Sequence, residues 1–305
     1  IMTVTVLLGT VYPLLLDALN LGKISVGPPY FNALFVPLTL IMAIFMGMGP
    51  VARWKDTRAK LLIQRLWLAA VLAVVMGMAL PLIFAERWSV AVAIGLIAAL
   101  WIVLPMFRDL FDKTRNAKSL GAGLKKLSLA YWGMQLGHLG VAVTMVGVAA
   151  VSNYEIERNV RMGVGDSASV AGYTFTMTEL SSHRGPNFLA DSAIIEVQRE
   201  GSQRSFTMTP EKRLYLARGM PMTQVALRPG FFRDLYVAMG EDLGDNTSAM
   251  RIQYKPFVRW LWLGGLLMAA GGVLAVADKR YRRLATAQDP ERKAALDAKP
   301  QEATT

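Results

Sequence analysis

The sequence predicts an α-helical multi-pass membrane protein with about six transmembrane helices and one inserted small all-β domain. Composition gives the class, because 53% of the 305 residues are hydrophobic and the mean hydropathy is +0.35, well above that of an ordinary soluble domain. Long uncharged segments alternate with short charged ones, and one stretch of about 100 residues shows the alternation of β-strands instead.

Six uncharged apolar segments account for the helices. About 20 apolar residues span a bilayer, and the segments lie at 1–16, 32–50, 66–84, 89–107, 127–151 and 260–277. The first segment is short for a span, and it opens on Ile1 rather than on methionine. We therefore expect that the sequence begins partway through a helix and is a fragment or one part of a split protein.

The net charge of +11 follows the pattern of a membrane protein and requires no nucleic acid partner. Bases outnumber acids in the short segments 51–65 and 108–128 and in the tail 278–305, whereas segment 153–255 has equal numbers of both. Because bases in short loops stay in the cytoplasm, we expect both ends of this chain inside and segment 153–255 exported. Trp260 then lies near the outer boundary of the last helix.

Segment 153–255 predicts a compact β domain, a small barrel or sandwich of six or seven short strands. Alternation of apolar and polar residues is clear in 173–177, 193–197 and 250–254, and weaker strand candidates lie at 205–209, 214–217, 223–227 and 235–238. We therefore expect five helices over 1–152, the β domain over 153–255, a last helix over 256–277, and a basic, disordered tail over 278–305.

His138 is the main candidate binding residue, because it lies near the centre of the uncharged run 127–151. Ionisable groups at that depth are costly and face a bundle interior or a ligand, and histidine is a common ligand for metals and haem iron. A simple hydrogen bond to a neighbouring helix is the alternative. A small-residue stripe beside it allows another helix, or a flat ligand, to approach closely; it comprises Gly133, Gly137, Gly140, Thr144 and Gly147. The histidine's own face carries Tyr131, Met134, Gln135, Val141, Ala142 and Met145.

The rest of the sequence offers little other chemistry. His183 is the second of two histidines and lies in the polar segment 181–185, which we interpret as an exposed loop. There is no cysteine, so the exported domain folds without disulfides, and this chain can supply no thiol for redox chemistry or covalent haem attachment. No metal-binding spacing, phosphate loop or nucleophile motif is present.

Several longer stretches carry a specific resemblance. They include LLGTVYPLLLDALNLGKISVGPPYFN (7–32), YWGMQLGHLGVAVTMVGVA (131–149), NYEIERNVRMGVGDS (153–167), EKRLYLARGMPMTQVAL (211–227), RDLYVAMGE (233–241) and YKPFVRWLWLGG (254–265). With these stretches the chain resembles the carboxy-terminal half of the CcmF/NrfE/CycK family, the membrane haem lyase subunit of bacterial cytochrome c maturation. The resemblance runs nearly end to end and fades after about Arg283.

The resemblance implies a function in cytochrome c-type biogenesis. Family members take haem b as substrate from a periplasmic haem chaperone and join its vinyl groups to the CXXCH thiols of apocytochrome c. His138, in the matching GHLG context, corresponds to a proposed axial ligand of the haem being attached. The opposing axial histidine belongs to the amino-terminal half, so this half cannot form the lyase site alone, and whether it counts as an enzyme stays open.

The same resemblance implies a location and a set of partners. The expected location is the bacterial inner membrane, with the β domain in the periplasm. The expected partners are membrane lipid, the amino-terminal half, the haem chaperone, and apocytochrome c with its thiol-handling delivery subunits.

Two other functions remain as alternatives. A haem exporter would use the helices as a conduit with His138 as a waypoint, but it would also place further ionisable groups inside the spans, and the sequence has none. A non-catalytic scaffold would dock the haem chaperone and apocytochrome through the β domain. This scaffold hypothesis predicts that haem binding does not depend on His138.

Overall fold

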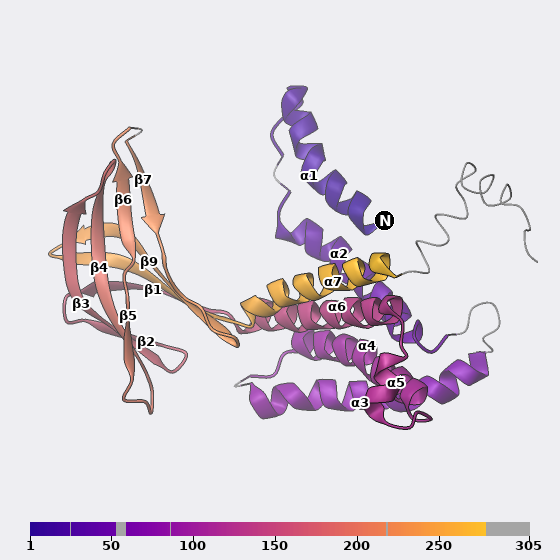
Figure 1. The fold of residues 1–305 in the computed structure, drawn as a ribbon. Helices are drawn as coiled ribbons and strands as arrows, with labels where there is room; N and C mark the ends of the chain where they lie inside the picture. The colour runs from indigo at the N-terminus through magenta and orange to yellow at the C-terminus, as the bar shows by residue number, and fades with distance from the viewer. Residues whose placement is uncertain (25, 53–58, 86, 218, 279–305) are drawn as a thin grey trace, which may run out of the picture. The chain divides into compact units, whose positions relative to one another are not determined.

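The computed structural model describes residues 1–24, 26–52, 59–85, 87–217 and 219–278 (Figure 1). The chain divides into two compact units, one formed by Ile1–Ala142 with the residues from Gly264 onward, the other by Val143–Leu263. We describe each unit separately. The predicted basic tail after Asp278 and most of the charged residues of segment 51–65 lie outside the described residues.

The described residues contain seven helices: α1 (Met2–Ala18), α2 (Pro28–Met48), α3 (Ala59–Phe84), α4 (Val90–Thr114), α5 (Leu120–Lys125), α6 (Leu129–Tyr154) and α7 (Val258–Ala277). Five of them, α2, α3, α4, α6 and α7, are long and apolar enough to cross a membrane. The sixth predicted segment forms α1, which is apolar but has only 17 residues. The short α5 was not predicted, because six residues within a basic segment show no helical periodicity.

Large apolar side chains on these helices face outward. Phe84 is 81% exposed, Trp262 76% and Leu266 69%, and similar residues recur along α2 and α3. Such exposure would be unfavourable in water but is expected where lipid covers the surface. The chain is therefore a multi-pass membrane protein.

Neighbouring helices meet closely at glycines. A Cβ atom on Gly9 of α1 would lie 2.5 Å from the ring of Tyr30 in α2, and one on Gly77 of α3 would lie 2.5 Å from Ile97 in α4. Gly47 of α2 accommodates Trp101 of α4, whose indole nitrogen donates to the carbonyl oxygen of Ile44 at 3.1 Å. Small residues at such contacts let two helices approach closely in the membrane.

The contact between α6 and α7 brings the backbones of the two helices against each other. A Cβ atom on Gly133 would lie 2.5 Å from the carbonyl oxygen of Gly271, and one on Gly140 would lie 2.6 Å from that of Gly264. These glycines are seven residues apart on each helix, which keeps them on one face over two turns. The predicted small-residue stripe is therefore, at these positions, a helix-packing surface.

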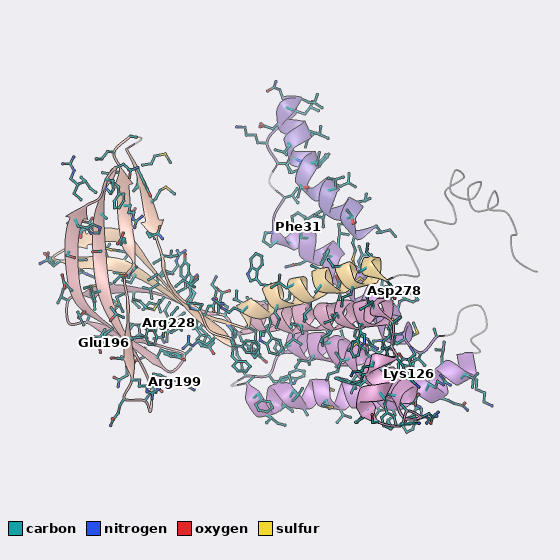
Figure 2. All side chains as sticks on the ribbon, in the orientation of Figure 1. Phe31, Lys126, Glu196, Arg199, Arg228 and Asp278 are labelled. Carbon is teal, nitrogen blue, oxygen red and sulfur yellow. The ribbon has the colours of Figure 1, made fainter. Side chains whose placement is uncertain are left out.

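The start of α6 is capped from two directions. The hydroxyl of Ser128 accepts a hydrogen bond from the Tyr131 amide at 3.1 Å. The carboxylate of Asp278, at the end of α7 and labelled in Figure 2, accepts one from the Ala130 amide at 2.8 Å. A carboxylate suits a helix amino terminus, because unpaired amides and the helix dipole both favour negative charge there.

The β domain is a sandwich of two antiparallel sheets (Figure 1). One has the order β1-β10-β9-β8, and the other has β2-β3-β4-β6-β7, with β5 pairing with β4. The ten strands in the described residues are β1 (Ile156–Gly163), β2 (Ser167–Val170), β3 (Tyr173–Arg184), β4 (Phe188–Arg199), β5 (Ser205–Met208), β6 (Glu211–Tyr215), β7 (Met220–Gln224), β8 (Ala226–Arg228), β9 (Arg233–Gly244) and β10 (Thr247–Pro256). The prediction of six or seven strands was therefore too low.

Three strand predictions need correction. Strand β1 was missed because charged residues at 157, 158 and 161 interrupt its apolar alternation, and β2 because it has only four residues. The predicted strand 223–227 is divided into β7 and β8, because the chain leaves one sheet and joins the other at Val225. Segments 165–166, 184–187, 200–201, 228–230 and 244–246, which carry turn-forming Gly, Pro, Asn or Asp, lie between strands or at their ends.

The core of the sandwich is apolar and fully enclosed. Both sheets contribute side chains that are at most 1% exposed, including Phe175, Met177, Ile195, Val197, Leu235, Val237, Met250 and Ile252. Burying a large side chain of this kind stabilises a fold by about 1.5–3 kcal/mol. A core of this size gives the cysteine-free domain its stability.

Replacing Gly140 with leucine should disrupt the contact between α6 and α7. The added side chain would collide with the backbone of Gly264, so we expect destabilisation of at least about 1–3 kcal/mol. Thermal unfolding of the detergent-solubilised protein measures this loss. Gly265→Leu is the matched control, because a Cβ atom at Gly265 meets nothing within 4 Å, and equal midpoints for the two variants would contradict the prediction.

The stability of the β domain should fall in acid partly through Glu157. A hydrogen bond from Gln253, its cross-strand partner, lowers the pKa of Glu157 below the ordinary 4.5, and the charge of Arg251 adds to the effect. Because the folded-state pKa is lowered, the stabilisation is present above pH 4.5 and is lost as the pH falls through the folded-state pKa. Unfolding midpoints measured from neutral to acidic pH should therefore fall less for Glu157→Gln than for the wild type, and parallel curves would contradict this assignment.

Candidate functional site

His138 is the tenth residue of α6, and its side chain is half-buried. Its Nδ1 atom lies 2.9 Å from the carbonyl oxygen of Met134, one turn earlier in the same helix. A carbonyl oxygen can only accept, so Nδ1 carries the proton and Nε2 carries the lone pair. This hydrogen bond fixes the tautomer that a metal ion bound at Nε2 requires.

The Nε2 atom faces the end of α2. A Cβ atom on Gly49, the C-cap residue of α2, would lie 4.0 Å from Nε2. Gly49 has no side chain to occupy this space, and no hydrogen bond of Nε2 is found in the described part of the chain. The nitrogen that can bind a metal therefore has no competing partner there.

His138 does not lie on the face of α6 that packs against α7. It precedes Gly140 by two residues, which places it about 200° away around the helix. The glycine face contacts α7, whereas the histidine face is near α2. The small-residue stripe and His138, which are adjacent in the sequence, therefore face different neighbours: the stripe faces α7 and the histidine faces α2.

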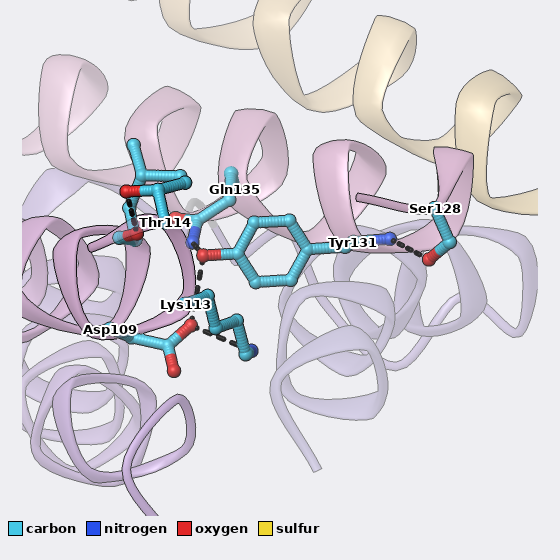
Figure 3. A network of polar contacts seen from close by, with 7 residues as sticks. Asp109, Lys113, Thr114, Ser128, Tyr131 and Gln135 are labelled. Atoms are coloured by element: carbon cyan, nitrogen blue, oxygen red, sulfur yellow. Dashed lines mark hydrogen bonds and ion pairs between the residues drawn. The ribbon is translucent and has the colours of Figure 1, made fainter. Parts of the chain in front are cut away.

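A polar network extends along the histidine face toward the start of α6 (Figure 3). The hydroxyl of Tyr131 donates to the Asp109 carboxylate of α4 at 2.9 Å, and Lys113 binds the same oxygen at 2.9 Å. The Lys113 ammonium also lies 4.2 Å from the centre of the Tyr131 ring. Gln135 completes the network by donating to the Tyr131 oxygen.

One atom of this network lacks a partner. Tyr131 gives its only proton to Asp109, so Gln135 must donate with its nitrogen, and its Oε1 is left as an acceptor. That oxygen is buried and has no donor among the described residues, and Gln135 is only 5% exposed. Gln135 lies one turn before His138, so the histidine face of α6 carries an unsatisfied acceptor.

The sequence analysis placed Tyr131 and Gln135 on the histidine face but did not predict the network. The spacing of four residues in both Asp109–Lys113 and Tyr131–Gln135 was a usable signal, because residues at that spacing are neighbours on a helix. What the sequence could not give is the contact between α4 and α6 that joins the two pairs.

His138 suits a metal that brings most of its own ligands. No cluster of three or more histidine, cysteine, aspartate or glutamate side chains occurs in the described residues, so the chain provides no complete coordination shell there. Haem iron needs only axial ligands from the protein. A single imidazole with a fixed tautomer and a free Nε2 fits that requirement.

His183 lies in strand β3, not in the loop that the sequence suggested. Its side chain is 46% exposed, and its Nε2 atom is 4.0 Å from a carboxylate oxygen of Glu211. The ring also contacts Phe188 edge-on, at 6.3 Å between centroids. The predicted surface position is therefore confirmed, and nothing around His183 resembles the environment of His138.

Comparison with known proteins agrees with this architecture. Residues 153–256 match the family described as the CcmF C-terminal beta-sandwich. The cytochrome c-type biogenesis protein CcmF of Pseudomonas aeruginosa is 46% identical over 278 residues, which are 91% of this chain and 42% of that protein. The chain thus resembles the carboxy-terminal part of CcmF-family proteins. It spans less than half the length of the curated relatives that it matches.

Further relatives show the same coverage. The CcmF protein of Escherichia coli is 40% identical over 93% of this chain and 42% of its own length, and the NrfE protein of Haemophilus influenzae is 34% identical over 93% and 43%. A solved structure described as cytochrome c heme lyase CcmF matches 90% of this chain and 43% of its own, with a TM-score of 0.70 and 20% identity. At that identity, the match shows a shared fold.

Replacing Tyr131 with phenylalanine should weaken the packing of α4 against α6. The change removes one of the two donors to the Asp109 carboxylate, with Lys113 left as the other, and leaves the Gln135 amide without an acceptor, which should cost about 1–3 kcal/mol. The unfolding midpoint in detergent measures this cost. Tyr12→Phe, on a half-exposed tyrosine of α1, is the control, and the prediction fails if both variants unfold with the wild type.

Proposed function

We propose that this chain acts in cytochrome c biogenesis as the haem-binding, carboxy-terminal part of a membrane haem lyase, with His138 as an axial ligand of the iron. The observation that carries the proposal is the division of roles between the two ring nitrogens of His138. Nδ1 is bound to the Met134 carbonyl, and Nε2 faces the space beside Gly49. Relatives described as cytochrome c-type biogenesis proteins support the pathway.

The chain contributes position and electronic tuning. The bond from Nδ1 to Met134 holds the imidazole ring in one orientation and increases the basicity of Nε2, which strengthens a metal bond there. When bound, haem supplies an iron whose potential depends on its axial ligands and burial, together with vinyl groups that can form thioethers. A fixed imidazole orients the ring edge toward incoming thiols, which lowers the entropic cost of the reaction.

The reaction also needs groups that this chain lacks. The chain has no cysteine, so the thiols come from a partner, and we propose that the opposing axial ligand does so as well. We propose that these partners are the amino-terminal part of a CcmF-type protein, a haem chaperone, and apocytochrome c with its delivery subunits. We propose a bacterial inner membrane location; the distribution of bases supports placing both ends in the cytoplasm and the β domain in the periplasm.

The position of His138 along α6 leaves two forms of this proposal: the haem bound there is the one transferred to apocytochrome c, or it stays bound during the reaction. Sixteen residues follow His138 in α6, so the helix end that leads into the β domain is roughly 24 Å further along. Gly49, its neighbour, directly precedes the basic segment 51–65. Haem that is transferred must move along the helix to the exported side, whereas haem that stays at His138 would serve the reaction without leaving.

The test is the haem absorption spectrum of the complex between this chain and the amino-terminal part of a CcmF-type protein. His138→Ala should remove one haem or its low-spin signature, and His183→Ala, the matched control, should leave the spectrum unchanged. An unchanged spectrum for His138→Ala would overturn the axial assignment and favour the scaffold. Adding apocytochrome c then separates the two forms, because only haem that is transferred disappears from the His138 site.

A second variant keeps the imidazole but fills the space beside it. Gly49→Leu places a side chain near Nε2 without backbone strain, because Gly49 has ordinary helical angles of φ −51° and ψ −52°. Haem should then be retained less well, although His138 is intact. Gly121→Leu is the control, because a Cβ atom there meets nothing within 4 Å.

A further inference from the structure

Four aromatic rings gather where strand β10 leads into helix α7. Phe231 and Phe232 lie in the turn between β8 and β9, Phe257 lies in the connection after β10, and Trp260 is the third residue of α7. Their centroids are 4.9 Å apart for Phe231 and Phe232, 5.0 Å for Phe257 and Trp260, and 5.9 Å for Phe231 and Trp260. The turn of the β domain is thus packed directly on the first turn of a membrane-spanning helix.

The rings of Phe231 and Phe232 are more than half exposed, which is unfavourable for an apolar side chain in water. Phe231 is 58% exposed and Phe232 60%, whereas the phenylalanine of the sandwich core, Phe175, is fully buried. Burial of a phenylalanine side chain is worth about 1.5–3 kcal/mol. Two adjacent exposed rings therefore indicate a surface that an apolar medium covers.

The backbone holds this turn in one conformation. The Gly230 amide donates to the Asp234 carboxylate at 2.9 Å, and the Phe257 amide donates to the Phe232 carbonyl at 2.8 Å. A Cβ atom on Gly230 would lie 2.6 Å from the carbonyl oxygen of Arg233, so a larger residue there would displace the turn. The exposed rings are therefore on a rigid support, not on a flexible loop.

The position of Trp260 indicates that the apolar medium covering Phe231 and Phe232 is membrane lipid. α7 is apolar enough to cross a membrane from Val258 onward, so its first turn lies at the boundary between water and lipid. Amphipathic aromatic rings concentrate at that level. Because Phe231 and Phe232 pack on Trp260, they lie at the same level as this first turn.

Exposed basic side chains beside the rings agree with a lipid surface. Arg259, next to Trp260, is 49% exposed and lies 3.4 Å from Asp234. Lys255 lies 3.1 Å from Glu155 and is about one-third exposed. Lipid phosphate and ester oxygens are available to such cations at this depth.

We propose that the aromatic turn, residues 229–232, inserts Phe231 and Phe232 into the lipid at the membrane surface and anchors the β domain there. Further along α7, Trp262 is also exposed to the lipid, at 76%. This anchor is a third attachment of the domain, in addition to its two connections to helices α6 and α7.

The absence of native cysteine allows a direct test on the whole chain. Single-cysteine variants Phe231→Cys, Trp262→Cys and Met222→Cys are labelled with an environment-sensitive fluorophore and reconstituted in nanodiscs of phosphatidylcholine and phosphatidylglycerol. Met222 is the matched control, because it is 58% exposed on strand β7 of the same domain. Nitroxide-labelled lipids should quench the labels at 231 and 262 to a similar degree and leave the label at 222 unquenched.

The opposite pattern overturns the proposal. A label at 231 that iodide quenches from water, like the label at 222, would show that the turn is not in lipid. A label at 231 that neither quencher reaches would show that protein covers the turn, which also excludes lipid. Circular dichroism checks that each variant is folded, and Phe232→Cys replaces Phe231→Cys if the latter is not.

Discussion

The backbone contact between α6 and α7 is the constraint on which most of the molecule depends. Glycines at positions 133 and 140 of one helix meet those at 271 and 264 of the other so closely that no side chain fits between them. In lipid, where there is no hydrophobic force between helices, such close packing is the main source of their association. The carboxylate of Asp278 fixes the same pair at one end by capping α6.

This contact decides what the remaining faces of α6 can do. Because the glycine face is occupied by α7, the opposite side, with Tyr131, Gln135 and His138, is available to α4 and α2. The polar groups on that side satisfy one another except at the Gln135 oxygen, and the histidine keeps one nitrogen free. Because α6 is lined with glycine on one side and polar on the other, it can pack against α7 and at the same time present His138 as a possible metal ligand.

Local patterns in the sequence predicted the parts of the structure that local chemistry determines. The apolar segments, the turns of the β domain and the central position of His138 within an apolar run required no knowledge of contacts. Strand β1 was missed because its stability comes from pairing with β10, some 90 residues later, and charged residues hide its alternation. The network around Asp109 was missed for the same reason, because it joins two helices whose contact no local pattern specifies.

The insertion of the β domain between α6 and α7 has a kinetic consequence. Gly140 and Gly264 are about 120 residues apart in the chain, so at roughly 5–20 residues per second a ribosome takes roughly 6–25 s to complete the partner of α6. During that time the glycine face of α6 is exposed to lipid or to other helices. The sandwich, whose strands mostly pair with close neighbours in sequence, has time to fold first. Its first and last strands are paired with each other, so the folded domain brings α7 back to α6 and shortens the search between the two helices.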